Sequence, residues 1–487
     1  MKDPSLLARD SDWSTWRVTI AGLGVAGYAA ADALMQLGAQ VTIMDAADGD
    51  RQREKGLILE QLGARVILGT SDVAPSDSDL LIVSPGVRPT APVILDALAR
   101  GMAVWGELEL AWRLRDANHA AAWLCVTGTN GKTTTTLMLE SMLRAAGYRT
   151  MSAGNIGVSL VDVVMHEALD VIAVEVGAPQ LSFVHSISPV ASVCLNAADD
   201  HIDHFGSMEE YLAAKARIYE RTQEAAVYNV QDVVTLRMVE AADVVDGCRA
   251  IGFTLGTPGL SMLGVVDDLL VDRAFVTDRD TIAQELATVS NVYPFAPHNV
   301  ANALAAACLA RAFGVPPTAV RDGLQAFVPA AHRIATVGAV GGVTYIDDSK
   351  ATNAHAAQMS LLAYEPIVWV AGGMAKGQAF DDLVRVTGSR LRAVVLMGVD
   401  RASIAQALSR HAPDVPVIDV ASIETGAMVE VVHRAAALAQ PGDTVLLAPG
   451  CASWDMFTDY GDRGRQFADA ARGLSGFVPA PSGRVDE

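Results

Sequence analysis

Residues 127–134 read TGTNGKTT, a glycine-containing loop between an apolar run at 123–127 and a helical pattern at 134–146. A strand, a glycine loop and a helix in this order present backbone N–H groups to a phosphate. We expect Lys132 to reach the transferred phosphoryl group and the Thr133 hydroxyl to ligate Mg²⁺. Two residues separate the glycines where the standard P-loop has four, so a coincidental Gly-Lys-Thr turn is the alternative.

Polar residues follow the next two apolar runs. Residues 171–174 end at Glu175, where a carboxylate can complete a magnesium site, although a strand-end acid at the surface is common. Residues 191–195 lead into NAADDHIDH at 196–204. In α/β proteins ligands bind beyond the carboxyl ends of the strands, so this segment is a second candidate, with a solvated loop as the alternative.

A second glycine motif lies near the N-terminus. Gly22, Gly24 and Gly27 form GxGxxG after an apolar run at 18–21, and the next strand pattern ends at Asp45. Glycines allow close approach of backbone to a pyrophosphate at a helix N-terminus. NAD is the simplest ligand and a UDP-sugar carries the same group, while a purely structural tight turn is the alternative.

The length of 487 residues predicts about three domains. Strand and helix signals alternate along the chain, and 250–296 is expected to be β-rich. We predict an α/β fold with three domains. They are a Rossmann-like parallel sheet at 1–105, a P-loop ATPase-like α/β domain at 106–330 and a Rossmann-like α/β domain at 331–487.

Composition excludes several classes of protein. Hydrophobic residues make up 51% and charged residues 19%, which is not a disordered composition. The net charge of −20 disfavours general binding to nucleic acid or anionic lipid. The five cysteines are an odd number without CxxC pairs, and no apolar stretch is long enough for a membrane helix. We expect free thiols and a soluble, cytoplasmic protein.

Eight motifs in order give the chain a specific resemblance. They are TGTNGKTT (127–134), NxxxDHxD (196–203), LAAKARIY (212–219), HNxxNA (298–303), HR (332–333), DDSKATN (347–353), GGxxKG (372–377) and CASxDxF (451–457). This series resembles the Mur ligases over essentially the whole chain. SPG at 84–86 and AGNIG at 153–157 resemble the branch that adds D-glutamate, and the DNPR signature of the diamino-acid-adding branch is absent.

The resemblance implies an ATP-dependent ligase that adds D-glutamate to UDP-N-acetylmuramoyl-L-alanine through an acyl phosphate. This is a step of peptidoglycan precursor synthesis, in cell-wall biogenesis. The implied cofactors are ATP and two Mg²⁺ ions, with Mn²⁺ as a substitute. A monomer acting on small molecules is expected, with no nucleic-acid partner and no membrane insertion.

The resemblance also implies roles for individual residues. The UDP-substrate residues would be Gly24, Val25, Ala26, Asp45, Gly86, Asn155 and His201. The ATP-binding residues would be Gly128, Thr129, Asn130, Gly131, Lys132, Thr133, Thr134, Asn302, Arg333 and Asp348. The D-glutamate residues would be Lys350, Thr352, Lys376, Ser453, Trp454 and Tyr460. The metal ligands would be Thr133, Glu175, His201 and a carbamoylated Lys215. The catalytic set would be Lys132, Glu175, His201, Lys215 and Arg333. Without the resemblance, Lys215 would be interpreted as a helix-surface lysine.

Two positions depart from the family pattern. Gly177 stands where a serine that can contact substrate is common, and Ala26 where a threonine is common. Both departures remove a possible hydroxyl contact and leave the metal-binding glutamate in place. The alternatives are a sister Mur ligase or folylpolyglutamate-synthase-like ligase, an NAD-dependent dehydrogenase built on the first glycine motif, and a non-catalytic nucleotide-binding regulator.

Overall fold

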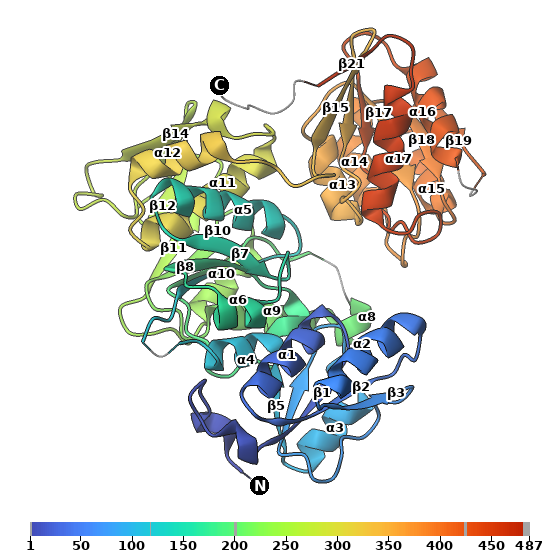
Figure 1. Cartoon of the computed structure of the whole chain (residues 1–487). Coiled ribbons are helices and arrows are strands. Elements are labelled where there is room, and N and C mark those ends of the chain that lie inside the picture. The colour runs from blue at the N-terminus through green and yellow to red at the C-terminus, as the bar shows by residue number, and fades with distance from the viewer. Residues whose placement is uncertain (1, 117, 199–201, 423–425, 481–487) are drawn as a thin grey trace. The chain divides into compact units, whose positions relative to one another are not determined.

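The computed structural model describes residues 2–116, 118–198, 202–422 and 426–480. Three sheets carry the fold, each with its helices (Figure 1). The chain divides into two compact units. The first comprises Met1–Val292 and Val300–Phe327, and the second comprises Tyr293–Asn299 and Val328–Glu487.

The first sheet has five parallel strands in the order β3-β2-β1-β4-β5. Its strands are β1 (Arg17–Ala21), β2 (Gln40–Asp45), β3 (Arg65–Leu68), β4 (Leu80–Val83) and β5 (Ala103–Gly106). Its helices are α1 (Val25–Gln36), α2 (Asp50–Gln61), α3 (Pro92–Ala99) and α4 (Glu107–Arg113). Every residue of β4 is buried, as expected for a central parallel strand that is covered on both faces.

The second sheet has nine strands in the order β14-β13-β12-β11-β10-β9-β6-β8-β7. Its strands are β6 (Ala122–Thr127), β7 (Thr150–Gly154), β8 (Val171–Glu175), β9 (Ala191–Cys194), β10 (Ala225–Asn229), β11 (Arg249–Phe253), β12 (Met262–Val266), β13 (Leu269–Asp272) and β14 (Gln284–Thr288). Its helices are α5 (Lys132–Ala145), α6 (Leu160–His166), α7 (Ala178–Leu181), α8 (Ile202–Phe205), α9 (Met208–Ala216), α10 (Val233–Glu240), α11 (Pro297–Ala312) and α12 (Pro317–Ala326). The strands from β7 to β12 pair in parallel, whereas β12, β13 and β14 pair antiparallel.

Close helix packing holds the phosphate-loop helix in place. Helix α5 lies against α12, and the Ser141 hydroxyl donates to the Gly323 carbonyl over 2.7 Å. A Cβ added at Gly323 would lie 2.5 Å from the Cα of Met142. The two helices therefore approach closely because position 323 has no side chain.

The third sheet has seven strands in the order β19-β18-β17-β20-β16-β15-β21. Its strands are β15 (Ala335–Val340), β16 (Val343–Asp347), β17 (Ile367–Gly372), β18 (Leu391–Met397), β19 (Val417–Asp419), β20 (Thr444–Leu447) and β21 (Phe477–Pro479). Its helices are α13 (Ala354–Leu361), α14 (Asp381–Thr387), α15 (Arg401–His411), α16 (Ala427–Leu438) and α17 (Tyr460–Arg472). Short 3₁₀ turns are η1 (Pro4–Leu6), η2 (Trp13–Thr15), η3 (Arg217–Tyr219), η4 (Val289–Asn291) and η5 (Gly388–Arg390).

The α/β class and the three sheets confirm the prediction. In the third sheet β15 pairs antiparallel with β16 and β21, whereas the other strand pairs are parallel. The capping box at 207–210 predicts a helix that runs to about Arg221, but helix α9 ends at Ala216 and continues as a 3₁₀ turn to Tyr219. The exact domain boundaries at 105/106 and 330/331 stay predictions.

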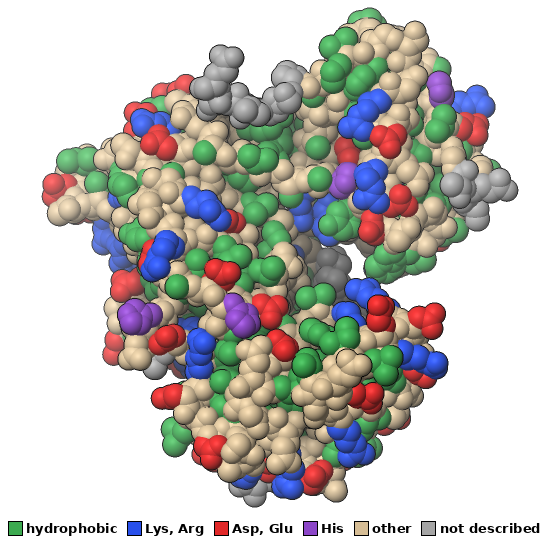
Figure 2. All heavy atoms as spheres, in the orientation of Figure 1, with side chains coloured by type: hydrophobic (Ala, Val, Ile, Leu, Met, Phe, Trp, Pro, Cys, Tyr) green, Lys and Arg blue, Asp and Glu red, His purple; other side chains and the backbone are tan. Residues whose placement is uncertain are grey.

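Two expectations from composition, on the cysteines and on membrane helices, can be compared with the structure. All five cysteines are free thiols. Among the helices of the described ranges, none is both long enough and apolar enough to cross a bilayer. The visible face has acidic and basic side chains interspersed rather than gathered by sign (Figure 2).

Candidate active site

The phosphate loop connects β6 to α5 and is fastened to the loop that follows β9. Gly131 adopts φ +85° at the start of α5. The Asn130 N–H donates to the Asn196 side chain over 2.9 Å, and the Asn196 amide donates back to the Asn130 carbonyl over 3.1 Å. The Lys132 ammonium donates to the carbonyls of Gly128 and Thr129 over 2.8 and 3.0 Å. The loop is therefore ordered, with its lysine folded against its own backbone.

Glu175 is a buried carboxylate at the carboxyl end of β8, with 2% of its surface exposed. The Thr133 hydroxyl donates to its Oε2 over 2.8 Å, and the Asn155 amide donates to its Oε1 over 2.9 Å. The alternative of an ordinary surface acid is wrong. Three segments distant in sequence thus meet at one carboxylate, at the sheet edge where the phosphate loop begins.

Residues of α9 complete this region. The Tyr211 hydroxyl and the Thr129 hydroxyl are 2.9 Å apart, and the Lys215 ammonium lies 4.7 Å from the Tyr211 ring centroid. Lys215 is only 1% exposed, so its interpretation as a surface lysine is wrong. His201 lies outside the described residues.

The oxygen groups fit magnesium. Mg²⁺ prefers carboxylate and hydroxyl oxygens, and Thr133 and Glu175 present one of each within hydrogen-bond distance. In the described ranges no group of three or more His, Cys, Asp or Glu side chains gathers as a metal cluster. Lys215, buried against the Tyr211 ring, is the group that carbamoylation would convert from a cation to an anion.

In the N-terminal GxGxxG motif, some glycines are required by packing and others are not. A Cβ added at Gly27 would lie 1.8 Å from the Gly22 carbonyl oxygen, so Gly27 is required by packing. No atom lies within 4 Å of a Cβ added at Gly24 or Gly86. Packing therefore does not explain these two glycines, and their backbone is left open to a ligand.

Asp45 and the start of α1 surround this open backbone. The Asp45 carboxylate accepts from the Leu23 N–H over 2.7 Å and from the Ala47 N–H over 2.8 Å. Val25 is 60% exposed at the first turn of α1. The glycine motif therefore forms a tight turn, which was the structural alternative to ligand binding, and it also leaves the N-terminus of α1 accessible. Ala26 lies in this same first turn.

Three loops of the second unit carry the residues predicted to bind the incoming amino acid. The Lys350 ammonium lies 4.1 Å from the Tyr460 ring centroid, and the Lys376 ammonium lies 4.3 Å from the Trp454 ring centroid. Ser453 is buried, whereas Trp454 is 64% exposed. Thr352 follows Lys350 on the same loop, and its N–H donates to the Lys350 carbonyl over 2.8 Å.

Sequence reasoning missed Arg463, which joins two of these loops, those of Lys350 and of Ser453. Its guanidinium is fully buried and donates to the Ser349 hydroxyl over 2.9 Å, the Ser349 carbonyl over 2.7 Å and the Cys451 carbonyl over 3.0 Å. The Ser349 hydroxyl donates to the Tyr460 carbonyl over 2.7 Å. Burial lowers the pKa of Arg463 to about 10. The sequence signal for its burial is that Arg463 precedes Phe467 by four residues, which places both on the apolar face of α17.

A pair of aspartates ends β16. Asp347 lies 2.6 Å from Nδ1 of His332, and Asp348 accepts from the Ser360 hydroxyl and from the Ile334 N–H. Burial raises the pKa of Asp348 to about 6, partly offset by the hydrogen bond from Ser360 and by the charge of Arg333. Arg333 and Asp348 belong to the second unit, and Asn302 of α11 belongs to the first.

The departure at Gly177 has a local geometric consequence. Its N–H donates to the Gln180 side-chain oxygen over 2.8 Å. A Cβ there would lie 3.3 Å from the side-chain oxygens of Asn155 and Gln180. A serine at this position would be tight but would displace only side-chain ends.

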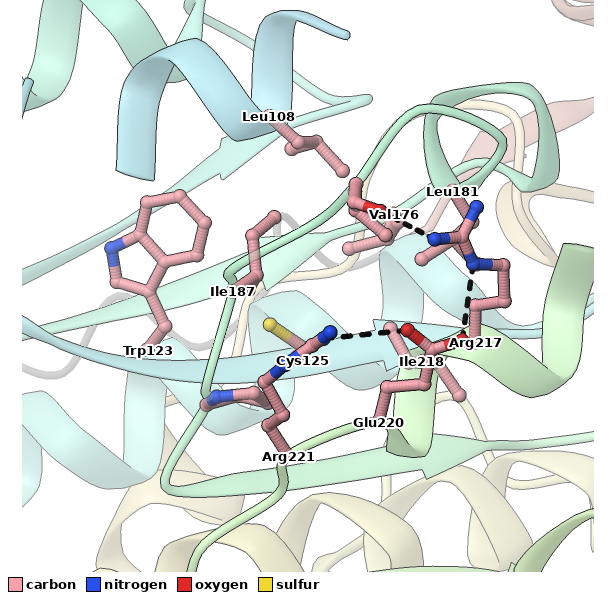
Figure 3. Close-up of a pocket in the computed structure, with 12 residues that line it drawn as sticks. Leu108, Trp123, Cys125, Val176, Leu181, Ile187, Arg217, Ile218, Glu220 and Arg221 are labelled. Atoms are coloured by element: carbon pink, nitrogen blue, oxygen red, sulfur yellow. Dashed lines mark hydrogen bonds and ion pairs between the residues drawn. The ribbon is translucent and has the colours of Figure 1, made fainter. Parts of the chain in front are cut away.

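A small cavity is lined in part by β6, the strand that leads to the phosphate loop (Figure 3). Its walls include Trp123 and Cys125 of β6, Leu108 of α4 and Arg217 of η3. The cavity volume of about 20 Å³ has room for about one water molecule. It is too small for any of the expected substrates.

Comparison with known proteins gives three domain matches. The Mur ligase MurD-like N-terminal domain matches residues 16–106, the Mur ligase middle domain matches 126–310, and the Mur ligase glutamate ligase domain matches 332–451.

Relatives match over nearly the whole chain. The UDP-N-acetylmuramoylalanine–D-glutamate ligase of Streptomyces coelicolor is 58% identical, over 95% of this chain and 99% of the relative. The enzyme of the same name from Mycolicibacterium smegmatis is 42% identical, over 94% and 97%. Among solved structures, MurF from Acinetobacter baumannii has a TM-score of 0.57 at 20% identity, over 88% of this chain and 90% of that one, and supports the fold. The chain belongs to the Mur ligase family.

Proposed function

We propose that the protein is the ATP-dependent ligase that joins D-glutamate to UDP-N-acetylmuramoyl-L-alanine in peptidoglycan precursor synthesis. The observation that carries the proposal is the buried Glu175 carboxylate, held by Thr133 and Asn155 beside the phosphate loop. The relatives bearing this activity in their names, among them one at 58% identity, support the choice of substrates.

The reaction needs an activated acyl group, because a carboxylate is a poor electrophile. The L-alanyl carboxylate attacks the γ-phosphorus of ATP, the bond from that phosphorus to ADP breaks, and the products are an acyl phosphate and ADP. Lys132 and Arg333 neutralise the charge that develops on the transferred phosphoryl group. The D-glutamate amine then attacks the acyl carbon, and phosphate leaves. Gly128, Thr129, Asn130, Gly131, Thr134, Asn302 and Asp348 bind the nucleotide in this proposal.

Magnesium would be held by Thr133 and Glu175, and would supply charge neutralisation at the phosphates. The proposal includes a second ion held by His201 and a carbamoylated Lys215, and it allows Mn²⁺ in place of Mg²⁺. The burial of Lys215 supports this part, because an unmodified buried cation would repel two metal ions.

The first sheet would bind the uridine diphosphate group. The open backbone at Gly24 and Gly86 supports this assignment, with Val25, Ala26 and Asp45 around it. Asn155 and His201 would contact the other end of the same substrate.

The second unit would bind D-glutamate through Lys350 and Lys376, one for each carboxylate. Thr352, Ser453, Trp454 and Tyr460 complete the site. The three-domain division at 1–105, 106–330 and 331–487 assigns these three binding tasks in chain order. We expect a cytoplasmic monomer.

The test is ADP release with ATP, Mg²⁺, UDP-N-acetylmuramoyl-L-alanine and each of several amino acids. We expect release that requires both the nucleotide sugar and D-glutamate, and that Lys132→Ala abolishes. Release with another amino acid would assign a sister activity within the family. No release with any amino acid would overturn the proposal.

A further inference from the structure

Helix α4 carries two buried carboxylates, Glu107 and Glu109, where the first sheet joins the second. Glu107 is 3% exposed and Glu109 is fully buried. Glu107 directly follows the last residue of β5 and is the first residue of α4. Buried carboxylates are costly unless they are bonded, so each should have a definite task.

Glu107 bonds to two segments beside the candidate site. Its Oε1 accepts from the Ser159 hydroxyl over 2.8 Å and from the Leu160 N–H over 3.0 Å. Its Oε2 accepts from the Gln180 amide over 3.4 Å. The Gln180 oxygen in turn accepts from the Gly177 N–H over 2.8 Å. One side chain thus joins the loop before α6 to the turn that follows β8.

These two segments flank Glu175. The loop before α6 contains Asn155, whose N–H donates to the Glu175 carbonyl over 2.8 Å and whose amide donates to the Glu175 carboxylate. The turn that follows β8 begins two residues after Glu175, at Gly177. A displacement of either segment would move Asn155 or Glu175 relative to the phosphate loop.

Glu109 has a different task, although it lies on the same helix. Its carboxylate accepts from the N–H groups of His185 and Ser186, from the Ser186 hydroxyl and from Arg113. Arg113 lies on α4 itself, and His185 and Ser186 lie in the segment that follows α7. Glu109 therefore fastens the same joint without touching the segments that flank Glu175.

We propose that Glu107 is a positioning residue that sets the Asn155 loop and the Gly177–Gln180 turn relative to the first sheet. The inference rests on the proposed function. The first sheet would hold the uridine diphosphate end of the substrate, and its L-alanyl carboxylate must reach the γ-phosphate. Glu107 directly follows β5, the last strand of the first sheet, and bonds to both segments that flank Glu175. It would therefore fix the distance between the uridine diphosphate site and the phosphate loop.

The two carboxylates allow a matched comparison by Glu→Gln substitution. Burial raises the pKa of Glu107, so a neutral amide at 107 should fold well. Burial also opposes the anion at Glu109, but hydrogen bonds from Ser186, His185 and Arg113 outweigh it and lower the pKa of Glu109. Glu109→Gln should therefore reduce the melting temperature more than Glu107→Gln does.

Activity should respond in the opposite order. In Glu107→Gln the new amide faces the Gln180 amide, donor against donor. We expect kcat to fall by about 10- to 100-fold, because a misplacement of about 1 Å can cost about 10²-fold. The KM values for D-glutamate and the nucleotide sugar should stay within about threefold. Glu109→Gln should leave kcat within about threefold of wild type.

A swapped pair tests the connection through Gln180. Gln180→Glu alone would place two carboxylates against each other and lose more activity than Glu107→Gln. The double variant Glu107→Gln/Gln180→Glu restores a donor facing an acceptor, and the new carboxylate at position 180 would still accept from the Gly177 N–H. We expect its kcat to recover to within about threefold of wild type.

The outcomes separate this inference from the proposed function. A double variant no better than Glu107→Gln, or equal kcat losses in Glu107→Gln and Glu109→Gln, would overturn the positioning role while wild-type activity stands. Wild-type protein that releases no ADP with the nucleotide sugar and D-glutamate would overturn the proposed function, and this inference with it.

Discussion

Two regions of the molecule hold their polar side chains in different ways. One is the phosphate end, the residues around Glu175 in the first unit, and the other is the proposed amino-acid end, the residues around Lys350 and Lys376 in the second unit. Around Glu175 the candidate residues bond to one another, through the Thr133 hydroxyl and the Asn155 amide. In the second unit Lys350 and Lys376 lie over aromatic rings. Arg463 donates hydrogen bonds to Ser349, next to Lys350, and to Cys451, on the loop that carries Trp454.

The difference follows from what each end would bind. Phosphoryl transfer needs groups preorganised at fixed positions, because stabilisation of the transition state depends on their geometry. A lysine over an aromatic face gains about 0.5–1 kcal/mol, and its ammonium carries the charge that attracts a carboxylate. Substitutions at the first end should therefore affect the chemistry, and substitutions at the second end should affect the affinity for the amino acid.

The largest effect is expected for Glu175→Gln. The amide keeps the shape and can accept from Thr133, but it removes the charge that magnesium requires. We expect kcat for ADP release to fall by at least about 10²-fold. Glu209→Gln, at an exposed position on α9, is the control and should match wild type. A Glu175→Gln enzyme with near-normal kcat would contradict the metal-binding role.

Lys215→Ala should also remove most of the activity. If Lys215 is carbamoylated, a small carboxylic acid can occupy the space and restore part of the charge. We expect formate or acetate to raise the ADP release of Lys215→Ala, and not that of Lys132→Ala, whose role is cationic. Full activity of Lys215→Ala without any additive would exclude the carbamate.

Arg463→Lys should affect the proposed D-glutamate site in the second unit. Lysine keeps the charge but lacks the planar fork that reaches Ser349 and Cys451 together. We expect the KM for D-glutamate to rise about tenfold, and the free energy of unfolding to fall by about 1–3 kcal/mol. The KM for ATP should not change. Arg465→Lys, with 62% of its side chain exposed, is the control on the same helix. Equal changes in both KM values would show that Arg463 does not act on the amino-acid loops alone.

The smallest effect is a pH-dependent change in stability at Asp348. Its folded-state pKa is raised from 3.8 to about 6, so its charged form opposes folding above that pH. Asp348→Asn removes this cost and should stabilise the protein at pH 8 by about 1–3 kcal/mol. The gain should fade as the pH falls through 6 toward 3.8.

Denaturant unfolding at several pH values measures this gain. Asp469→Asn, at a side chain that is 72% exposed, should show none of it. A gain for Asp348→Asn that does not change with pH would point to packing rather than to the titration of this carboxyl.

The sequence by itself determined the fold class and the phosphate end of the candidate site. Strand, glycine loop and helix are contiguous at 122–145, and Glu175 directly ends an apolar strand. The carboxyl ends of neighbouring parallel strands share one sheet edge, so β6, β8 and β9 bring their following residues together by topology alone.

Only the tertiary structure showed which polar groups distant in sequence bond to one another. Glu107 meets Gln180 across 73 positions, and Arg463 meets Ser349 across 114. Gly24 and Gly27 are identical in the motif, yet only Gly27 is required by packing. The antiparallel strands β15 and β21, at one end of the third sheet, also escaped prediction. The physical reason is that local pattern encodes which face of an element is apolar, whereas the partner of a buried polar group depends on which distant element packs against it.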